Sequence, residues 1–157
     1  MINAFDQYTT TLLVEDKQAF EISNGVCRSL GFSDTSLVAC RGTYAILCDG
    51  SSTYWRGSLG PWSRADFDVL LKKPVVSVAT RHNEALLVTA SGEAWLIGPN
   101  TTNSRKRRGA VSGGSGLAQV ARQGSRWWAL DTQGRLWSSS GTSMTMEYVA
   151  APFGPVR

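Results

Sequence analysis

The chain has 157 residues, which favours one domain with a core of its own over two independent domains. Hydrophobic residues make up 42% of the sequence and charged residues 18%, a balance that excludes a wholly disordered chain. Apolar runs are at most five residues long, so neither a membrane-spanning helix of about 20 residues nor an ordinary signal peptide is expected. We therefore expect a protein of the cytoplasm or of an assembled particle.

Residue types that carry catalysis and bind metals are sparse. Cys27, Cys40 and Cys48 cannot all pair within one chain and lack C-x-x-C spacing, so we expect buried thiols in a reducing compartment rather than disulfides or a zinc site. The single histidine, His82, is expected as a strand-end or loop residue, and no nucleophile motif accompanies it. The sequence therefore predicts no enzyme, no catalytic or metal-ligating residue and no cofactor.

Four copies of a sequence repeat organise the chain. Each copy has an alanine near its start, two apolar residues eight and nine positions later, and an aromatic residue sixteen positions after the alanine. The alanines are Ala4, Ala39, Ala79 and Ala121, and the aromatic residues are Phe20, Trp55, Trp95 and Trp137. Successive alanines are 35, 40 and 42 residues apart, a period typical of solenoids and propellers.

Within a copy, the pattern predicts short β-strands. The third copy contains three apolar runs of four or five residues, at 75–79, 85–88 and 94–97, which is too short for helices. Gly92 and Gly134 lie at the same offset in the third and fourth copies, where a hairpin connection needs a positive φ angle. The fold class predicted is all-β, a small β-propeller-like array of about four repeats. A β-sandwich with similar hairpins is the alternative.

The predicted array forms a single domain over residues 1–157. Its repeat units are approximately 1–25, 26–60, 73–98 and 117–141, and residues 146–151 supply a closing strand that joins the last unit to the first. The array is either four-bladed or open. If it is open, we expect another chain to cover the free edge.

The third copy carries a resemblance to a known family. Four segments resemble a repeat of the regulator of chromosome condensation family: Trp55–Gly60, Val75–Ala79, Ala85–Val88 and Ser91–Trp95. The chain departs from that pattern at Ser58, which stands in place of Gln, and at Thr80 and Arg81, which stand where glycine is expected. The copies are also shorter, closer to those of tectonin-like and tachylectin-like propellers. The resemblance implies a propeller fold and leaves the function open, because such propellers serve as exchange factors, lectins and scaffolds.

Positive charge gathers in the C-terminal part of the chain. The net charge is +4, and residues 101–157 hold eight basic and two acidic side chains, whereas residues 1–50 hold three and six. Four of the basic residues are adjacent: Arg105, Lys106, Arg107 and Arg108. Such a run binds phosphates or an acidic protein surface, or is merely a soluble loop tip, and the sequence leaves both interpretations open.

Six tryptophans are many for this length. The core is expected to contain the three that occupy the repeat position: Trp55, Trp95 and Trp137. Trp62 falls outside the repeat, in the long connection after the second copy. Trp127 and Trp128 are consecutive in a predicted strand, so their side chains point to opposite faces and at least one is exposed or covered by a partner. Together with Arg126 they are candidate partner-binding residues.

With catalysis disfavoured, the sequence predicts a non-enzymatic interaction or scaffold module, a structural component of a larger assembly such as a virion or phage particle. Its expected partners are proteins of that assembly, and a second copy of the chain is also allowed. A tectonin-like lectin is one alternative, although its repeated polar cluster has only approximate counterparts in Asp49, Ser91 and Asp131. Binding of nucleic acid or an acidic partner through residues 105–108 is another alternative, although the chain lacks the repeated aromatic platforms on which single-stranded nucleic acids stack.

Overall fold

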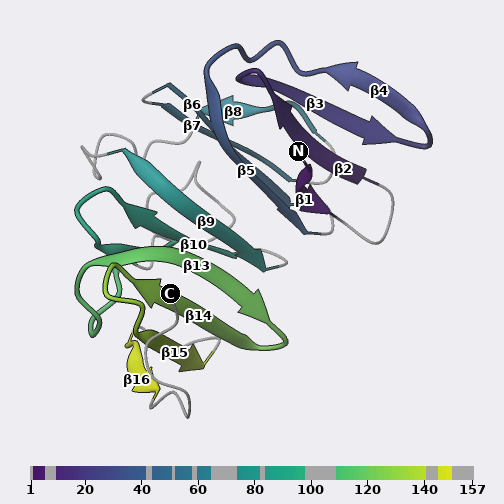
Figure 1. The fold of residues 1–157 in the computed structure, drawn as a ribbon. Coiled ribbons are helices and arrows are strands. Elements are labelled where there is room, and N and C mark those ends of the chain that lie inside the picture. The colour runs from purple at the N-terminus through teal and green to yellow at the C-terminus, as the bar shows by residue number, and fades with distance from the viewer. Residues whose placement is uncertain are drawn as a thin grey trace. The chain divides into compact units, whose positions relative to one another are not determined.

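The computed structural model describes residues 2–5, 10–41, 44–50, 52–57, 60–64, 74–81, 84–97, 109–140 and 145–149. Within these ranges the chain is all-β, with 16 strands arranged in four antiparallel four-stranded sheets (Figure 1). Among the same residues there is no helix with the length and hydropathy needed to cross a membrane. The chain divides into two compact units, Met1–Lys72 with Thr80–Asn83, and Lys73–Ala79 with Glu84–Arg157.

The first unit holds two sheets whose strands follow chain order. The first sheet consists of β1 (Ile2–Phe5), β2 (Thr10–Glu15), β3 (Gln18–Ser23) and β4 (Val26–Ser29). The second sheet consists of β5 (Thr35–Arg41), β6 (Tyr44–Asp49), β7 (Ser52–Arg56) and β8 (Ser63–Arg64). Sequential antiparallel strands joined by short turns are the simplest sheet connection, because each strand pairs with its neighbour in the chain.

The second unit holds the fourth sheet and nearly all of the third. The third sheet consists of β9 (Val75–Arg81), β10 (Glu84–Thr89), β11 (Ala94–Ile97) and β12 (Gly109–Ala110). The fourth sheet consists of β13 (Leu117–Gln123), β14 (Arg126–Asp131), β15 (Leu136–Ser140) and β16 (Glu147–Val149). Both repeat the consecutive strand order of the first unit.

The sequence repeat coincides with these sheets. In each sheet the repeat alanine lies in the first strand, the apolar pair in the second and the aromatic residue in the third. Trp95 of β11 pairs with Leu87 of β10, and Trp137 of β15 pairs with Ala129 of β14. The all-β, four-repeat array predicted from the sequence is thus confirmed. Each copy of the repeat corresponds to one sheet, and each repeat position falls in the same strand of its sheet.

The fourth strand of each sheet is the part that the repeat did not indicate. Residues 26–29 form β4 and pair with β3 in the first sheet. Within residues 146–151, β16 pairs with β15 and completes the fourth sheet. Single-domain organisation and closure of the array stay predictions.

The predicted hairpin glycines have the expected backbone. Gly92 has a φ of 80° and Gly134 a φ of 76°, the left-handed region that glycine adopts without a steric cost. The amide of Gly92 donates to the carbonyl of Thr89 at 2.8 Å, and the amide of Gly134 donates to the carbonyl of Asp131 at 3.0 Å. The β10–β11 and β14–β15 connections are therefore closed by the same kind of tight turn.

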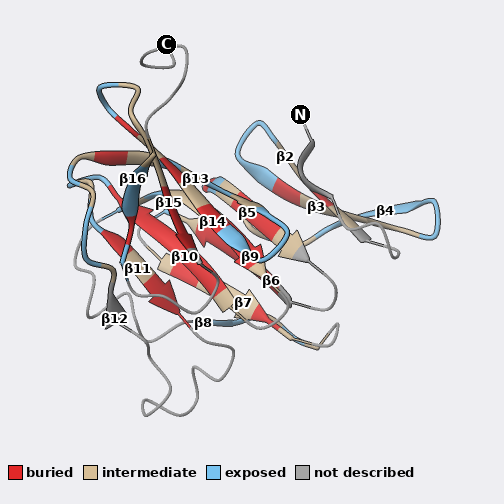
Figure 2. Ribbon diagram, turned by 90° about the horizontal axis from the view of Figure 1, so that it is seen from below, coloured by how far each residue is buried: buried red, intermediate tan, exposed pale blue. Residues whose placement is uncertain are grey.

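The second strands supply much of each core, as the red segments of Figure 2 show. In the first unit, Leu12 and Ala19 of the first sheet pack with three residues of the second: Val38, Ala45 and Leu47. In the second unit, the core combines residues of both sheets: Ala79, Leu86, Val88, Ala94, Leu96, Leu117, Trp127, Ala129 and Met146. Each unit thus buries apolar side chains between two sheets, the usual source of stability in such layers.

The burial of the tryptophans differs from the expectation that the repeat positions form the core. The repeat tryptophans Trp55, Trp95 and Trp137 are only half-buried, whereas Trp127 is 1% exposed and lies in the core of the second unit. Trp62, although it falls in the connection after the second copy, is half-buried and packs against the core of the first unit. The reason is register: a shift of one position in a strand moves a side chain to the other face of the sheet, and the repeat does not encode that choice.

The cysteines were also expected to be buried. Cys48 is buried, but Cys40 is half-buried and Cys27 is exposed, and no disulfide joins any two of these three described residues. Cys27 lies in β4, whose four residues are all exposed because this strand is the last of its sheet.

Candidate functional site

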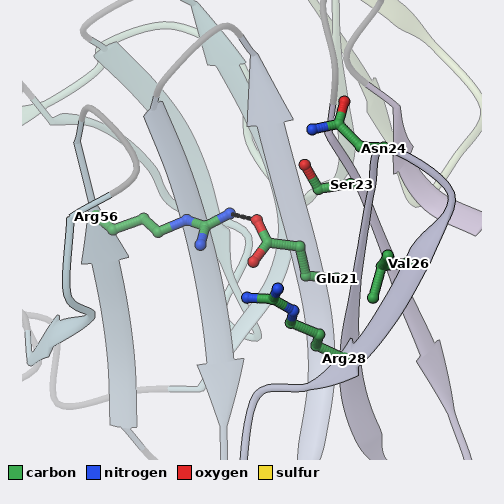
Figure 3. Close-up of a pocket in the computed structure, with 6 residues that line it drawn as sticks. All are labelled: Glu21, Ser23, Asn24, Val26, Arg28 and Arg56. Atoms are coloured by element: carbon green, nitrogen blue, oxygen red, sulfur yellow. Dashed lines mark hydrogen bonds and ion pairs between the residues drawn. The ribbon is translucent and has the colours of Figure 1, made fainter.

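A partly open cavity of about 320 Å³ lies in the first unit, and we call it the edge groove (Figure 3). It is lined by Glu21, Ser23, Asn24, Val26, Arg28 and Arg56. The first five come from β3, β4 and the turn between them, and the last comes from the end of β7 in the second sheet. The groove therefore joins the outer part of the first sheet to one arginine of the second.

A two-residue turn determines the local structure of this hairpin. Asn24 and Gly25 have φ angles of 50° and 74°, which is the geometry of a type I′ turn. The turn fixes the register that pairs Ser23 with Val26 and Glu21 with Arg28. Residues directly opposite each other on antiparallel strands have their side chains on the same face, so Glu21 and Arg28 are neighbours there.

Arg56 is a buried charge. Its side chain is 7% exposed, and Nη2 donates a hydrogen bond to Oε1 of Glu21, whose side chain is 17% exposed. The Cζ atom of Arg56 also lies 4.9 Å from the ring centroid of Trp62, in a cation–π contact. A buried arginine needs such partners, because an uncompensated charge in the interior is strongly destabilising.

The partners of Arg56 do not use all of its donors. The Nε atom is buried and has no acceptor among the residues that the structure describes. Leaving a buried donor unsatisfied costs about 1–3 kcal/mol. Other buried donors of the described residues are likewise unpaired, among them Nε1 of Trp62 and of Trp127, so this nitrogen alone does not mark a ligand site.

The groove carries a surplus of one positive charge. Its ionisable side chains are Glu21, Arg28 and Arg56, one acid and two bases. Figure 3 shows the two arginines pointing toward the carboxylate of Glu21 from opposite sides. Arg28 belongs to the fully exposed β4, so its guanidinium is accessible to a ligand.

A second polar cluster surrounds Asp131 at the β14–β15 turn. Its carboxylate accepts bonds from the amides of Gln133 and Arg135, both at 2.9 Å, from Arg135 Nε at 2.6 Å and from Trp137 Nε1 at 3.0 Å. Burial acts to raise the pKa of Asp131, but these hydrogen bonds outweigh it and lower the pKa to about 2. With its acceptors already occupied, the carboxylate holds the hairpin together.

The counterparts proposed for a lectin cluster also form local hydrogen bonds. Asp49 Oδ1 accepts a bond from the amide of Asp34 at 2.8 Å and another from Thr35 Oγ1 at 3.2 Å. The hydroxyl oxygens of Ser91 and Thr89 lie 2.9 Å apart. Together with Asp131, these residues stabilise turns and strand ends of their own sheets.

The predicted partner-binding residues fall in different places. Arg105, Lys106, Arg107 and Arg108 lie outside the described residues, and so does His82. Arg126 is exposed and its Nη1 donates to Ser138 Oγ at 3.2 Å. Trp127 is covered by the core of its own unit, whereas Trp128 is half-buried on the opposite face of β14. The two side chains thus lie on opposite faces of β14, as their adjacency predicts, and neither is fully exposed.

The edge groove was not predicted from the sequence. Glu21 and Arg56 are 35 residues apart and belong to different sheets, so no local motif joins them. The Asn24-Gly25 dipeptide was the available signal, because Asn-Gly between apolar alternations is the strongest short indication of a hairpin.

No family model and no curated protein sequence matches this chain. Solved structures do match. Human WBSCR16 has a TM-score of 0.67 at 16% identity, over 94% of this chain and 52% of that one. YCF48 from Cyanidioschyzon merolae has a TM-score of 0.66 at 16% identity, over 96% of this chain and 56% of that one. Prp20p from Saccharomyces cerevisiae has a TM-score of 0.64 at 11% identity, over 93% of this chain and 49% of that one.

The fold is of the β-propeller type. The identities are low, so the likeness concerns the arrangement of strands and not the residues of any site. This chain spans about half the length of the propeller proteins that it matches.

Proposed function

We propose that this chain is a non-enzymatic interaction module that holds a protein partner at the edge groove. We further propose that it is a structural component of a larger assembly, with a virion or phage particle as one setting and the cytoplasm as the other. Kinship with the regulator of chromosome condensation repeats, carried by the third copy, belongs to the same proposal.

One observation carries the proposal. In the edge groove, the exposed cation Arg28 lies on an exposed strand beside the buried Arg56–Glu21 ion pair, so the lining carries a surplus of one positive charge. A surplus charge beside an accessible strand favours a partner of complementary charge, because that partner supplies both a charge-assisted hydrogen bond and backbone hydrogen bonds.

Structures with the same fold support this class of function. One of them is YCF48 bound to D1 peptide, which matches at a TM-score of 0.62 and 15% identity. Another is Prp20p, which has binding properties to Gsp1p and histones. These partners belong to those proteins, and what we extend to this chain is the binding of a protein by a propeller-type surface.

Site-specific cross-linking in the native source tests the proposal. A photoreactive residue replaces Val26, which lines the groove and is 51% exposed, or Val76, an exposed valine of β9 that serves as the matched control. We expect one identified protein to cross-link at position 26 and not at position 76. The same protein is expected in the native complex when its mass is measured.

A second variant separates the groove from its surroundings. Arg28→Gln removes the accessible charge without touching the buried ion pair, and we expect it to abolish the cross-link at position 26. A cross-link that is equally strong at both valines, or unchanged in the Arg28 variant, would reject the edge groove as the binding site.

A further inference from the structure

We propose that the edge groove binds an extended acidic peptide, which adds to β4 as a further antiparallel strand and places one carboxylate beside Arg28. This inference rests on the proposed function and specifies the chemistry of the partner. It follows from the free edge of β4, from the direction of its side chains and from the charge of the groove.

The outer edge of β4 is open to a further strand. Among the described residues β4 pairs with β3 alone, and all four of its residues are exposed. An exposed strand edge presents backbone donors and acceptors in a row, which is the template for strand addition.

The register shows which backbone groups are available. The amide of Leu30 donates to the carbonyl of Ala19, so these two opposite residues form a hydrogen-bonded pair. Two and four residues earlier in the chain, Arg28 and Val26 form the next hydrogen-bonded pairs with β3. Antiparallel bonding alternates from one residue to the next. The amide and carbonyl groups of Cys27 and Ser29 therefore point to the outer edge, where a peptide strand would bond to them.

The same alternation places one peptide side chain in the groove. A peptide residue directly opposite Arg28 forms a pair without mutual hydrogen bonds, the closer kind, and its side chain lies on the face of Arg28. That face is the one that carries Glu21 and lines the groove with Arg56. The side chains of the flanking peptide residues lie on the opposite face with Cys27.

Charge selects the residue at that position. Glu21 is paired with Arg56, which leaves the charge of Arg28 to be matched by the ligand. One surplus cation balances one carboxylate, and a guanidinium–carboxylate pair is among the stronger hydrogen-bonded contacts. An aspartate or glutamate opposite Arg28 therefore fits better than a neutral or basic residue.

Binding of a designed peptide to the full chain tests the inference. The probe is a short fluorescent peptide of alternating threonine and valine with one central aspartate, and its matched control has asparagine at the centre. We expect the aspartate peptide to bind about tenfold more tightly, the ratio that corresponds to one charge-assisted contact. In the Arg28→Gln variant the two peptides should bind alike, and the unfolding temperature should be unchanged because Arg28 is exposed.

Backbone methylation tests the strand geometry. N-methylation of the residues that flank the aspartate blocks their bonds to Cys27 and Ser29 and should abolish binding. N-methylation of the aspartate itself should be tolerated, because its amide points away from β4. Equal sensitivity at all three positions would overturn strand addition.

The outcomes separate the two proposals. Equal affinity for the aspartate and asparagine peptides in the wild-type chain overturns the acidic class and leaves the interaction function standing. If neither peptide binds but a partner is still cross-linked at position 26, the addition of an acidic peptide strand is overturned and the proposed interaction function stands. Failure of both peptides and of the cross-link rejects both proposals.

Discussion

Trp137 Nε1 donates a hydrogen bond of 3.0 Å to Oδ2 of Asp131, across the β14–β15 hairpin of the fourth sheet. The aromatic position of the repeat is therefore linked to the last residue of the preceding strand. Arg135 strengthens the arrangement, since its guanidinium bonds the same carboxylate and lies 5.8 Å from the Trp137 ring. Tyr148 of β16 meets that ring edge-on at 5.6 Å, so the contacts extend to the outer strand.

The pKa of Asp131 predicts a specific acid sensitivity. Hydrogen bonds lower this pKa to about 2 from 3.8, so the stabilisation is complete above pH 4 and is lost as the pH falls toward 2. A shift of this size corresponds to about 2 kcal/mol of unfolding free energy. We expect Asp131→Asn to be less stable at neutral pH and to lack this acid dependence, as measured by urea unfolding across that range.

The exposed Asp16 of the β2–β3 turn supplies the control. Asp16→Asn should keep both the neutral-pH stability and the acid profile of the wild-type chain. An Asp131→Asn variant with an unaltered profile would show that the hydrogen bonds at this turn do not govern the acid response.

The tryptophan pair of β14 predicts unequal losses of stability. Trp127→Ala removes a fully buried ring from the core of the second unit and should cost about 3–5 kcal/mol. Trp128→Ala removes a half-buried ring on the opposite face and should cost clearly less. Chemical denaturation of both variants checks this order. Equal losses would mean that the register of β14 differs from the one described.

Repetition made the strand positions predictable, whereas burial depended on register. The alanine and the aromatic residue recur at a constant spacing because each hairpin needs a similar number of residues. The alanine therefore marks the first strand of every sheet and the aromatic residue marks the third. The pattern does not say which face a residue takes, and for that reason it placed Trp95 in the core. The edge groove depends on Glu21 and Arg56, which only the pairing of two separate sheets brings together.

Gly92 and Gly25 form a matched pair for a packing prediction. Both have positive φ angles, so alanine is strained at either position, at a cost of about 1–2 kcal/mol. A Cβ at Gly92 would lie 2.6 Å from the Cα of Gly116, whereas a Cβ at Gly25 has nothing within 4 Å. We expect Gly92→Ala to be the less stable variant by at least about 1 kcal/mol, since a backbone must move. Thermal unfolding that ranks the two equally would contradict this close approach.

The basic run gives a prediction that depends on the sequence alone. Replacing Arg105, Lys106, Arg107 and Arg108 together by Ser should leave the melting temperature nearly unchanged if these side chains are a solvated surface, because exposed charges contribute little to stability. If the run also contacts phosphates or an acidic surface, affinity for that partner should fall. The remaining affinity should depend less steeply on salt, because each lost phosphate contact removes about one unit of slope. If the affinity and the salt slope of the variant both match those of the wild-type chain, the run does not bind the partner. Binding would then be left to the edge groove, so the Arg28→Gln variant is measured in the same series.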